Sequence, residues 1–385
     1  MDCFTVVRDL ISIDTSVPPG RNYEKTIDYL EPLFHHVGFE TQKIRIPAKC
    51  ADGYKGRVNL IAHRRNAGKP RLIFYAHIDV VPAQGWEAFK PREDGGKIYG
   101  RGAADMKGGI AALLLGLEAA DQGKLKYDTS VIVTTDEEVG QASQIRFLGQ
   151  FLQPLSGAYF FDLDSSFGCV TIASLGAIHL DIKVTGRSVH SALSHLGENA
   201  VEQANLLINA LSELKREVIQ RKSQVDAEPA TGLTKMESRL NINMIKGGLK
   251  VNIVPDECSI AIDRRLIPEE TLEEAERELI QTLSSVAGVR WEIEKLTRIP
   301  TVPPLDDPIV DKLAKVIQDV TGDSGIFGEM GSGDFGPVAT LEWDARHFGS
   351  GVIRPECNIH GKDEFVYKKD IEDLARIIPR FISTE

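Results

Sequence analysis

The chain has 385 residues, of which 42% are apolar and 26% charged, and its 45 Lys and Arg against 56 Asp and Glu give a formal net charge of −11. This composition is typical of a globular protein of roughly two to three domains. The acidic charge argues against a general nucleic-acid binder and against a protein that binds anionic membrane surfaces. Five scattered cysteines form no CxxC pair, and no basic segment precedes an apolar stretch at the N-terminus, so we expect a cytoplasmic protein without disulfides.

Helical and strand patterns alternate through the first 175 residues. Apolar residues recur with helical spacing at 2–13, Asn22 and Gly38 are placed to cap a helix at 23–37, and a further helix is expected at 106–120. Between them lie continuous apolar runs of the kind found in strands that are buried on both faces, at 71–81, 129–135 and 157–162. This alternation predicts an α/β domain in which a mostly parallel sheet has helices on both faces.

The pattern changes after Gly176. Strict alternation of apolar and polar residues predicts a strand at 177–186, followed by a helix, two strands around a Gly247-Gly248 turn within 239–266, a helix and a further strand. This β-α-β-β-α-β order is the signature of a ferredoxin-like fold. We therefore expect a discontinuous domain of residues 1–175 and 296–385, interrupted by an inserted α+β domain of residues 176–295.

Acidic residues and histidines follow the predicted strands and loops of the discontinuous domain. The candidates are His77, Asp79, Asp105, Asp136, Glu137, Glu138, Asp162, Asp164 and His360. Taken singly, each has a simpler interpretation, such as a helix N-cap or a solvated side chain. However, ligands of parallel α/β sheets bind beyond the carboxyl ends of the strands, so we expect these side chains to converge. Histidine nitrogens with carboxylate oxygens are the ligand set of zinc, or of cobalt or manganese in the same geometry.

The spacing within this set suggests how the roles are divided. His77 and Asp79 are two residues apart, so in an extended segment they point to the same side, and Asp79 can orient the imidazole. Of the neighbouring Glu137 and Glu138, one carboxylate can bind a metal ion. The other can then act as a base toward a metal-bound water, whose pKa is about 7.

Five stretches occur in the order found in a known family: YAHIDVVP at 75–82, GRGAADMKGG at 100–109, TTDEEVG at 134–140, GRSVHSALSHLGENA at 186–200 and NIHGKDEFV at 358–366. On these stretches the chain resembles the dinuclear zinc amidohydrolases and peptidases that include acetylornithine deacetylase, succinyl-diaminopimelate desuccinylase, aminoacylase-1 and carboxypeptidase G. The resemblance implies a zinc-peptidase-like catalytic domain of residues 1–175 and 296–385. Residues 176–295 would form a ferredoxin-like lid and dimerisation domain.

The resemblance also implies two zinc ions per chain, for which cobalt or manganese would be substitutes. One ion would be held by His77, Asp105 and Asp162. The other would be held by Asp105, Glu138 and His360, so that Asp105 bridges the two ions.

The same resemblance assigns roles around the ions. Asp79 would orient His77. Glu137 would be the general base for a metal-bridged hydroxide and would pass the proton to the leaving amine. In the family, a lid histidine reaches the active site of a dimer partner and stabilises the oxyanion, and His190 matches it. Arg265 matches an arginine that binds the substrate carboxylate, with Asn252 assisting.

The sequence departs from the family pattern at two places. The family has a Glu-Pro-Thr-like stretch at the fourth ligand, whereas this chain has FFDLDSS; the position directly after the apolar run favours Asp162, and Asp164 is the alternative. The segment GSGVIRPEC before His360 is longer than usual, which would reshape the specificity pocket. Ser332 and Asp334 are further candidates for substrate contact.

The expected function is metal-dependent hydrolysis of the amide bond of an N-acyl amino acid. The expected partners are that small substrate, or a peptide, and a second copy of the chain bound through the lid, with no nucleic acid and no membrane. A metallo-carboxypeptidase or dipeptidase is the alternative, because the sequence does not distinguish the specificity pockets. A non-catalytic amino-acid- or peptide-binding protein on the same fold is disfavoured, because every ligand type and Glu137 are present.

Overall fold

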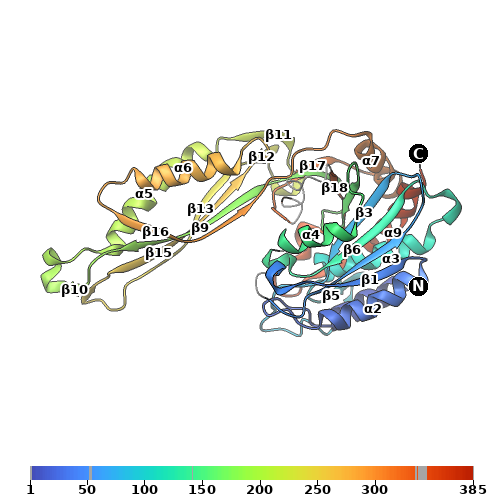
Figure 1. The fold of residues 1–385 in the computed structure, drawn as a ribbon, viewed down its shortest axis with the longest axis horizontal. Coiled ribbons are helices and arrows are strands. Elements are labelled where there is room, and N and C mark those ends of the chain that lie inside the picture. The colour runs from blue at the N-terminus through green and yellow to red at the C-terminus, as the bar shows by residue number, and fades with distance from the viewer. Residues whose placement is uncertain (1, 52–53, 141, 334–335, 337–344, 385) are drawn as a thin grey trace. The chain divides into compact units, whose positions relative to one another are not determined.

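The computed structural model describes residues 2–51, 54–140, 142–333, 336 and 345–384, and the chain folds into two compact units (Figure 1). The large unit comprises Met1–Ile172, Leu305–Phe327 and Gly333–Glu385. The inserted unit comprises Ala173–Pro304 and Gly328–Ser332. It extends past residue 295 because the strand that contains this residue continues to Ile299 within the same sheet.

An eight-stranded sheet forms the centre of the large unit, in the order β1-β2-β6-β3-β7-β18-β8-β17. Its strands are β1 (Glu40–Arg45), β2 (Val58–Arg64), β3 (Arg71–His77), β6 (Asp128–Thr134), β7 (Tyr159–Asp162), β8 (Val170–Ser174), β17 (Ile326–Glu329) and β18 (Arg346–Gly349). The strands β6, β3, β7 and β18 pair in parallel, whereas β1, β2 and β8 join them antiparallel. The carboxyl ends of the four parallel strands therefore lie at one edge of the sheet.

The helices of the large unit pack against the central strands, which explains why these strands are apolar. The helices are α1 (Cys3–Ser12), α2 (Tyr23–His36), α3 (Gly108–Ala119), α4 (Ala142–Leu148), α7 (Pro308–Thr321) and α9 (Lys368–Ser383). Leu72 and Phe74 of β3 belong to a hydrophobic core that α1, α2, α3, α7 and α9 share, whereas the alternate residue Ile73 is buried on the opposite face. Because both faces are covered, β3 shows no alternation of polar residues. Burial of Phe74 alone stabilises the fold by about 1.5–3 kcal/mol.

A smaller sheet, in the order β19-β5-β4, lies outside the central one. Its strands are β4 (Arg92–Asp94), β5 (Lys97–Tyr99) and β19 (Phe365–Tyr367). The short helical turns of the large unit are η1 (Ala48–Cys50), η2 (Ala103–Lys107), η3 (Gln122–Lys124), η4 (Glu137–Val139), η5 (Gly149–Phe151) and η8 (Pro355–Cys357). The pairing of β5 with β19 brings an early segment of the chain next to its C-terminal segment.

The inserted unit is a four-stranded antiparallel sheet with two helices on one face (Figure 1). Its main elements are β9 (Gly176–Thr185), α5 (Ala200–Val218), β13 (Arg239–Gly247), β15 (Glu257–Leu266), α6 (Leu272–Ser284) and β16 (Arg290–Ile299). Shorter elements are β10 (Val189–His190), η6 (Ser191–Leu196), β11 (Lys222–Asp226), η7 (Pro229–Thr231), β12 (Lys235–Glu237) and β14 (Ile253–Val254). The alternate residues Ile178, Leu180 and Ile182 of β9 form the core with both helices. The β13-β15-β9-β16 order agrees with the ferredoxin-like signature of the sequence.

Candidate metal centre

His77 is the last residue of β3, and its imidazole is fully buried. Nδ1 of His77 lies 3.2 Å from the backbone carbonyl oxygen of Asp79 and 3.5 Å from Oδ1 of the same residue. Nε2 of His77 lies 3.1 Å from Oδ1 of Asp105. Asp79 thus contacts one ring nitrogen and leaves the other directed at Asp105. Oδ2 of Asp79 also accepts the backbone N–H of Glu138 at 3.0 Å.

Asp105 lies between the two candidate histidines. Its Oδ1 faces His77, and its Oδ2 lies 3.1 Å from Nε2 of His360. The same nitrogen of His360 lies 3.0 Å from Oε2 of Glu138. Two groups of possible ligands therefore share Asp105, namely His77, Asp105 and Asp164, and Asp105, Glu138 and His360. Within each group the ligand atoms lie within 4.8 Å of one another.

The structure groups Asp164, and not Asp162, with His77 and Asp105. Oδ2 of Asp164 lies 3.5 Å from Nε2 of His77. Asp162 is the last residue of β7, and its Oδ1 accepts the backbone N–H of Asp164 at 2.8 Å. This hydrogen bond stabilises a turn, and the turn carries the side chain of Asp164 to the cluster. The geometry therefore favours Asp164, the alternative that the sequence offers, over Asp162 at the end of the strand.

The donor atoms fit divalent metal ions. Zinc binds imidazole and carboxylate at about 2.0–2.2 Å, so two of its ligands at a tetrahedral angle are about 3.3–3.6 Å apart. The donor atoms of His360 and Glu138 are 3.0 Å apart, and those of His77 and Asp164 are 3.5 Å apart. Carboxylates gathered this closely repel one another unless cations compensate them. Oδ1 of Asp164 is buried and has no hydrogen-bond partner among the described residues, as suits an atom that binds a metal ion.

The close packing of charge shifts the pKa values within the cluster. Burial raises the pKa of Glu138 to about 7, and the charge of Asp105 adds to this effect. Hydrogen bonds to Asp105 and Glu138 raise the pKa of His360 to about 10. Burial lowers the pKa of His77, but hydrogen bonds to the surrounding carboxylates, that of Asp105 first, outweigh burial and leave the pKa well above its usual value. Metal ions that bind here therefore compete with protons on the imidazoles.

The turn that follows β6 is fixed by a buried network around Asp136. Asp136 has a φ of 65°, in the left-handed region, and immediately precedes Glu137. Its carboxylate accepts hydrogen bonds from Nε of Arg57 at 2.6 Å, from the hydroxyl of Tyr23 at 2.8 Å and from Nε2 of Gln144 at 2.9 Å. The sequence did not predict these contacts, because the partners come from three separate segments and no local pattern links them.

Glu137 begins η4 beside Glu138, and its side chain is half-buried. Its Oε1 lies 3.9 Å from the position that a Cβ atom on Gly333 would take. Glu137 belongs to neither ligand group, whereas its neighbour Glu138 belongs to one. Asp334, which the sequence suggested as a substrate contact, lies outside the described residues.

His190 and Asn252 lie side by side in the inserted unit. His190 of β10 pairs with Ile253 of β14, and the backbone N–H of Ser191 donates to the carbonyl of Asn252 at 3.1 Å. His190 is exposed, and its Nδ1 accepts the backbone N–H of Ala192 at 3.1 Å. Because Nδ1 is an acceptor, the neutral ring carries its proton on Nε2.

Arg265 lies on β15 at the other end of the inserted sheet. Its Nε donates to Oδ1 of Asp263 at 2.8 Å, and its Nη1 donates to Oγ of Ser332 at 2.7 Å. Arg265 pairs with Ala177 at one end of β9, whereas Glu257 pairs with Thr185 at the other end, five residues before His190. Eight residues of strand, about 27 Å, separate these two positions. The structure therefore brings Arg265 together with Ser332, and His190 together with Asn252, but keeps the two pairs apart.

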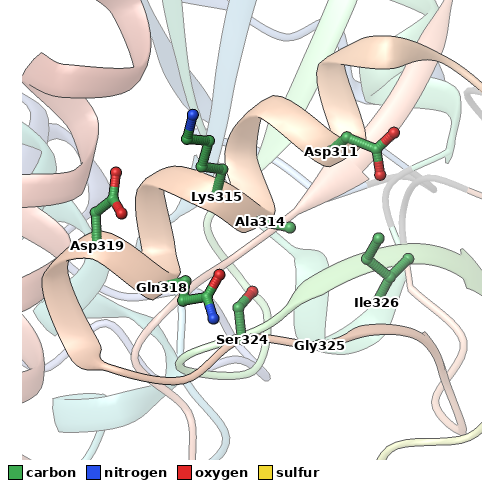
Figure 2. A pocket seen from close by; sticks show the side chains of 8 residues that line it. All are labelled: Asp311, Ala314, Lys315, Gln318, Asp319, Ser324, Gly325 and Ile326. Carbon is green, nitrogen blue, oxygen red and sulfur yellow. The ribbon is translucent and has the colours of Figure 1, made fainter.

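A hollow of about 550 Å³ lies between α7 and β17 (Figure 2). It is lined by Asp311, Ala314, Lys315, Gln318, Asp319, Ser324, Gly325 and Ile326. Figure 2 shows the charged side chains on the helix and the smaller residues along the opposite side. None of these lining residues is a histidine or a member of the two ligand groups.

Comparison with known proteins places the chain in a family. The model of Peptidase family M20/M25/M40 matches residues 73–384, which is well over half of the chain. The chain belongs to this family. It is thus a metal-dependent, peptidase-like hydrolase, and every residue of the two ligand groups lies within the matched range.

Named relatives agree with this placement. The chain is 28% identical over 291 residues to a probable succinyl-diaminopimelate desuccinylase of Staphylococcus aureus, covering 69% of this chain and 67% of the relative. It is also 28% identical over 378 residues to acetylornithine deacetylase of Myxococcus xanthus, covering 96% of this chain and 92% of that enzyme.

Solved structures share the fold of this M20-family chain. An M20 family metallo-carboxypeptidase of Sulfolobus solfataricus superposes with a TM-score of 0.78 at 16% identity, covering 100% of this chain and 99% of the other. The aminopeptidase PepT of Bacillus cereus gives 0.76 at 18% identity, with coverage of 99% and 97%. Among the described residues, no helix combines the length and the apolar character needed to cross a membrane.

Proposed function

We propose that this protein removes the acyl group from a small N-acyl amino acid by hydrolysing the amide bond. The observation that carries the proposal is Asp105, whose two oxygens face the two histidines, so that both ligand groups share this residue. The desuccinylase and deacetylase names of the relatives support the class of substrate. Zinc is the first choice of metal because the ligand groups combine imidazole and carboxylate at suitable spacing.

In this proposal His77, Asp105 and Asp164 hold one ion, and Asp105, Glu138 and His360 hold the other. When bound, the ions lower the pKa of water and polarise the substrate carbonyl. Asp79 keeps the ring of His77 oriented toward the cluster. Glu137 is the general base that takes a proton from the attacking water and delivers it to the leaving amine.

The inserted unit supplies the remaining groups as a lid. Arg265 binds the substrate carboxylate, held in place by Asp263 and Ser332. His190 donates from Nε2 to the oxyanion of the tetrahedral intermediate, with Asn252 beside it. Because β15 extends about 27 Å from Arg265 to Glu257, and His190 follows β9 beyond the end at which Glu257 pairs, both reach one substrate only when they come from different chains.

A homodimer through the lid is therefore part of the proposal. Apolar side chains near His190 are exposed, among them Leu249 at 94% and Val251 at 98%, as suits a surface that a second chain covers. The free cysteines suit the reducing cytoplasm, where we place the enzyme.

The test is release of primary amine after metal is stripped with chelator and zinc or cobalt is restored. The panel contains N-acetylornithine, N-succinyl-diaminopimelate, other N-acyl amino acids and a few dipeptides. Metal-dependent turnover of an N-acyl amino acid is the expected result. Turnover of dipeptides alone would replace the proposal with a dipeptidase, and a protein that binds no metal would refute it.

Two variants test the roles of individual residues. Glu137→Gln should abolish turnover and keep the metal content of the wild type, whereas loss of metal would make Glu137 a ligand. His190→Ala should lower kcat by a factor of about 100 or more. When the two inactive variants are mixed and allowed to exchange chains, about a quarter of the wild-type activity should return, because hybrid dimers contain one complete site. No recovery despite proven exchange would place His190 in its own chain's site or outside the reaction.

A further inference from the structure

Arg101 and Glu364 form a buried ion pair next to the candidate metal centre. Their side chains are 3% and 0% exposed, and Nη1 of Arg101 donates to Oε2 of Glu364 at 2.6 Å. The two residues meet because β5 and β19 pair antiparallel, with Tyr99 opposite Phe365. The backbone N–H of Gly100 continues this pairing by donating to the carbonyl of Glu364 at 2.9 Å. The register of two short strands thus sets the ion pair.

Each member of the pair also holds the backbone of one candidate ligand. Nη2 of Arg101 donates to the carbonyl of His360 at 2.9 Å. Oε1 of Glu364 accepts the backbone N–H of Ala104 at 3.2 Å and that of Asp105 at 3.3 Å. Arg101 therefore restrains His360, Glu364 restrains Asp105, and the ion pair links the two. These are the ligands whose side-chain atoms lie 3.1 Å apart.

The segment that carries His360 needs such a restraint. His360 has a φ of 61°, in the left-handed region that residues with a side chain seldom adopt. Its side chain is 52% exposed, so packing holds it only in part. The contact from Arg101 to the carbonyl of His360 fixes the peptide at this point.

Glu364 itself is not placed to bind a metal ion. Its two oxygens already accept from a guanidinium and from two backbone N–H groups, and it belongs to neither ligand group. Both oxygens of this buried carboxylate are therefore occupied by hydrogen bonds within the protein.

We infer that Arg101 and Glu364 are positioning residues that set the spacing of Asp105 and His360, and through it the affinity of the metal position formed by Asp105, Glu138 and His360. The inference rests on the proposed function, since it concerns the same centre. Groups behind metal ligands commonly change metal affinity by about 10–100-fold when they are altered.

Glu364→Gln is the primary test. Glutamine keeps the size of the side chain and one oxygen for the backbone N–H groups, but it removes the charge opposite Arg101. The metal-free protein is titrated with Co²⁺, followed by visible absorption, and with Zn²⁺ in competition with a chelator. We expect the first equivalent to bind within about threefold of wild type, and the second to bind about 10–100-fold more weakly with an altered cobalt spectrum.

Arg101→Lys is a second variant in case Glu364→Gln does not fold. Lysine keeps the positive charge but lacks the fork that donates to Glu364 and to His360 at once. The same weakening of the second equivalent is expected.

Asp128→Asn is the matched control, at the opposite end of the central sheet. Asp128 begins β6 and accepts from Nη1 of Arg71 at 3.1 Å and from the backbone N–H of Asn66 at 2.9 Å. Like Glu364, Asp128 accepts hydrogen bonds from an arginine and from a backbone N–H, but neither partner is a candidate metal ligand. We expect this variant to bind both metal equivalents as the wild type does.

The outcomes separate this inference from the proposed function. If Glu364→Gln and Arg101→Lys bind both metal equivalents with wild-type affinity, whatever their thermal stability, the ion pair only stabilises the fold. That result would overturn this inference and leave the proposed function intact. A wild-type protein that binds no metal would overturn the proposed function as well.

Discussion

Asp136→Asn tests how firmly the large unit fixes the turn before Glu137. Asparagine has the same shape and also tolerates positive φ, so the substitution removes chiefly the charge. Asp136 and Arg57 have side chains that are only 1% and 3% exposed and lie 2.6 Å apart. Loss of one partner from a buried ion pair costs about 3–5 kcal/mol. Arg57 keeps its contacts with the carbonyl of Pro19 and the ring of Tyr54, so we expect a loss near the lower end, about 3 kcal/mol.

Urea unfolding of the metal-free proteins, followed by circular dichroism and tryptophan fluorescence, measures this loss. The double variant Arg57→Met/Asp136→Asn removes the unpaired cation and should recover at least about 1 kcal/mol relative to the single variant. Asp28→Asn is the control, because Asp28 is 56% exposed in its pair with Lys43 and should change stability by less than about 1 kcal/mol. If the free energy of unfolding of Asp136→Asn is within about 1 kcal/mol of the wild-type value, the guanidinium of Arg57 is not desolvated as its burial implies.

Three further predictions concern single positions. Asp164→Asn should reduce bound metal from two equivalents to about one, while Asp162→Asn keeps both. Elemental analysis of the dialysed proteins measures the number of bound metal ions. The reverse pattern would make Asp162 the ligand. Gly351→Ala would place a Cβ atom against the backbone oxygen of Ser165. The midpoint of thermal unfolding should therefore fall by several degrees. An unchanged midpoint would contradict the close contact. Burial lowers the pKa of His347 to about 3, so the folded state stays neutral while the unfolded chain takes up a proton below about pH 6.5. Stability is therefore lost as the pH falls through this window, and between pH 7 and pH 5 the wild type should lose about 2 kcal/mol more than His347→Phe; equal losses would remove His347 as a cause.

The strands of the large unit could be predicted because their causes are local. The run at 71–81 contains β3, whose side chains are buried on both faces, and a parallel sheet then places the residues at its carboxyl ends together. This is why His77 and Glu138, which follow neighbouring strands, face the same cluster. The helices α1 and α2 are equally local and lie within the segments 2–13 and 23–37 where the sequence predicts them.

The features that the sequence did not predict depend on turns and on distant contacts. A turn of two residues carries Asp164, rather than Asp162, to the cluster, and the apolar run gave no sign of this turn. The sequence pattern predicts one strand from the Gly247-Gly248 turn to residue 266, but residues 253 and 254 pair with β10 instead, because Pro255 has no N–H to continue the ladder. The partners of the Arg101–Glu364 pair are 263 residues apart, and their meeting depends on a register that only the folded chain defines.

The inserted unit enters and leaves through two segments that lie side by side. Ser174 and Val302 exchange backbone hydrogen bonds at 3.3 and 3.2 Å, so the ends of residues 173–304 are about one strand spacing apart. Every residue of the two ligand groups lies outside this segment, whereas Arg265 and His190 lie within it. A recombination event with breakpoints at these two places would exchange residues 173–304 and leave both ligand groups untouched. The architecture thus allows the proposed carboxylate-binding and oxyanion groups to change together during evolution, while the residues of both ligand groups are inherited unchanged.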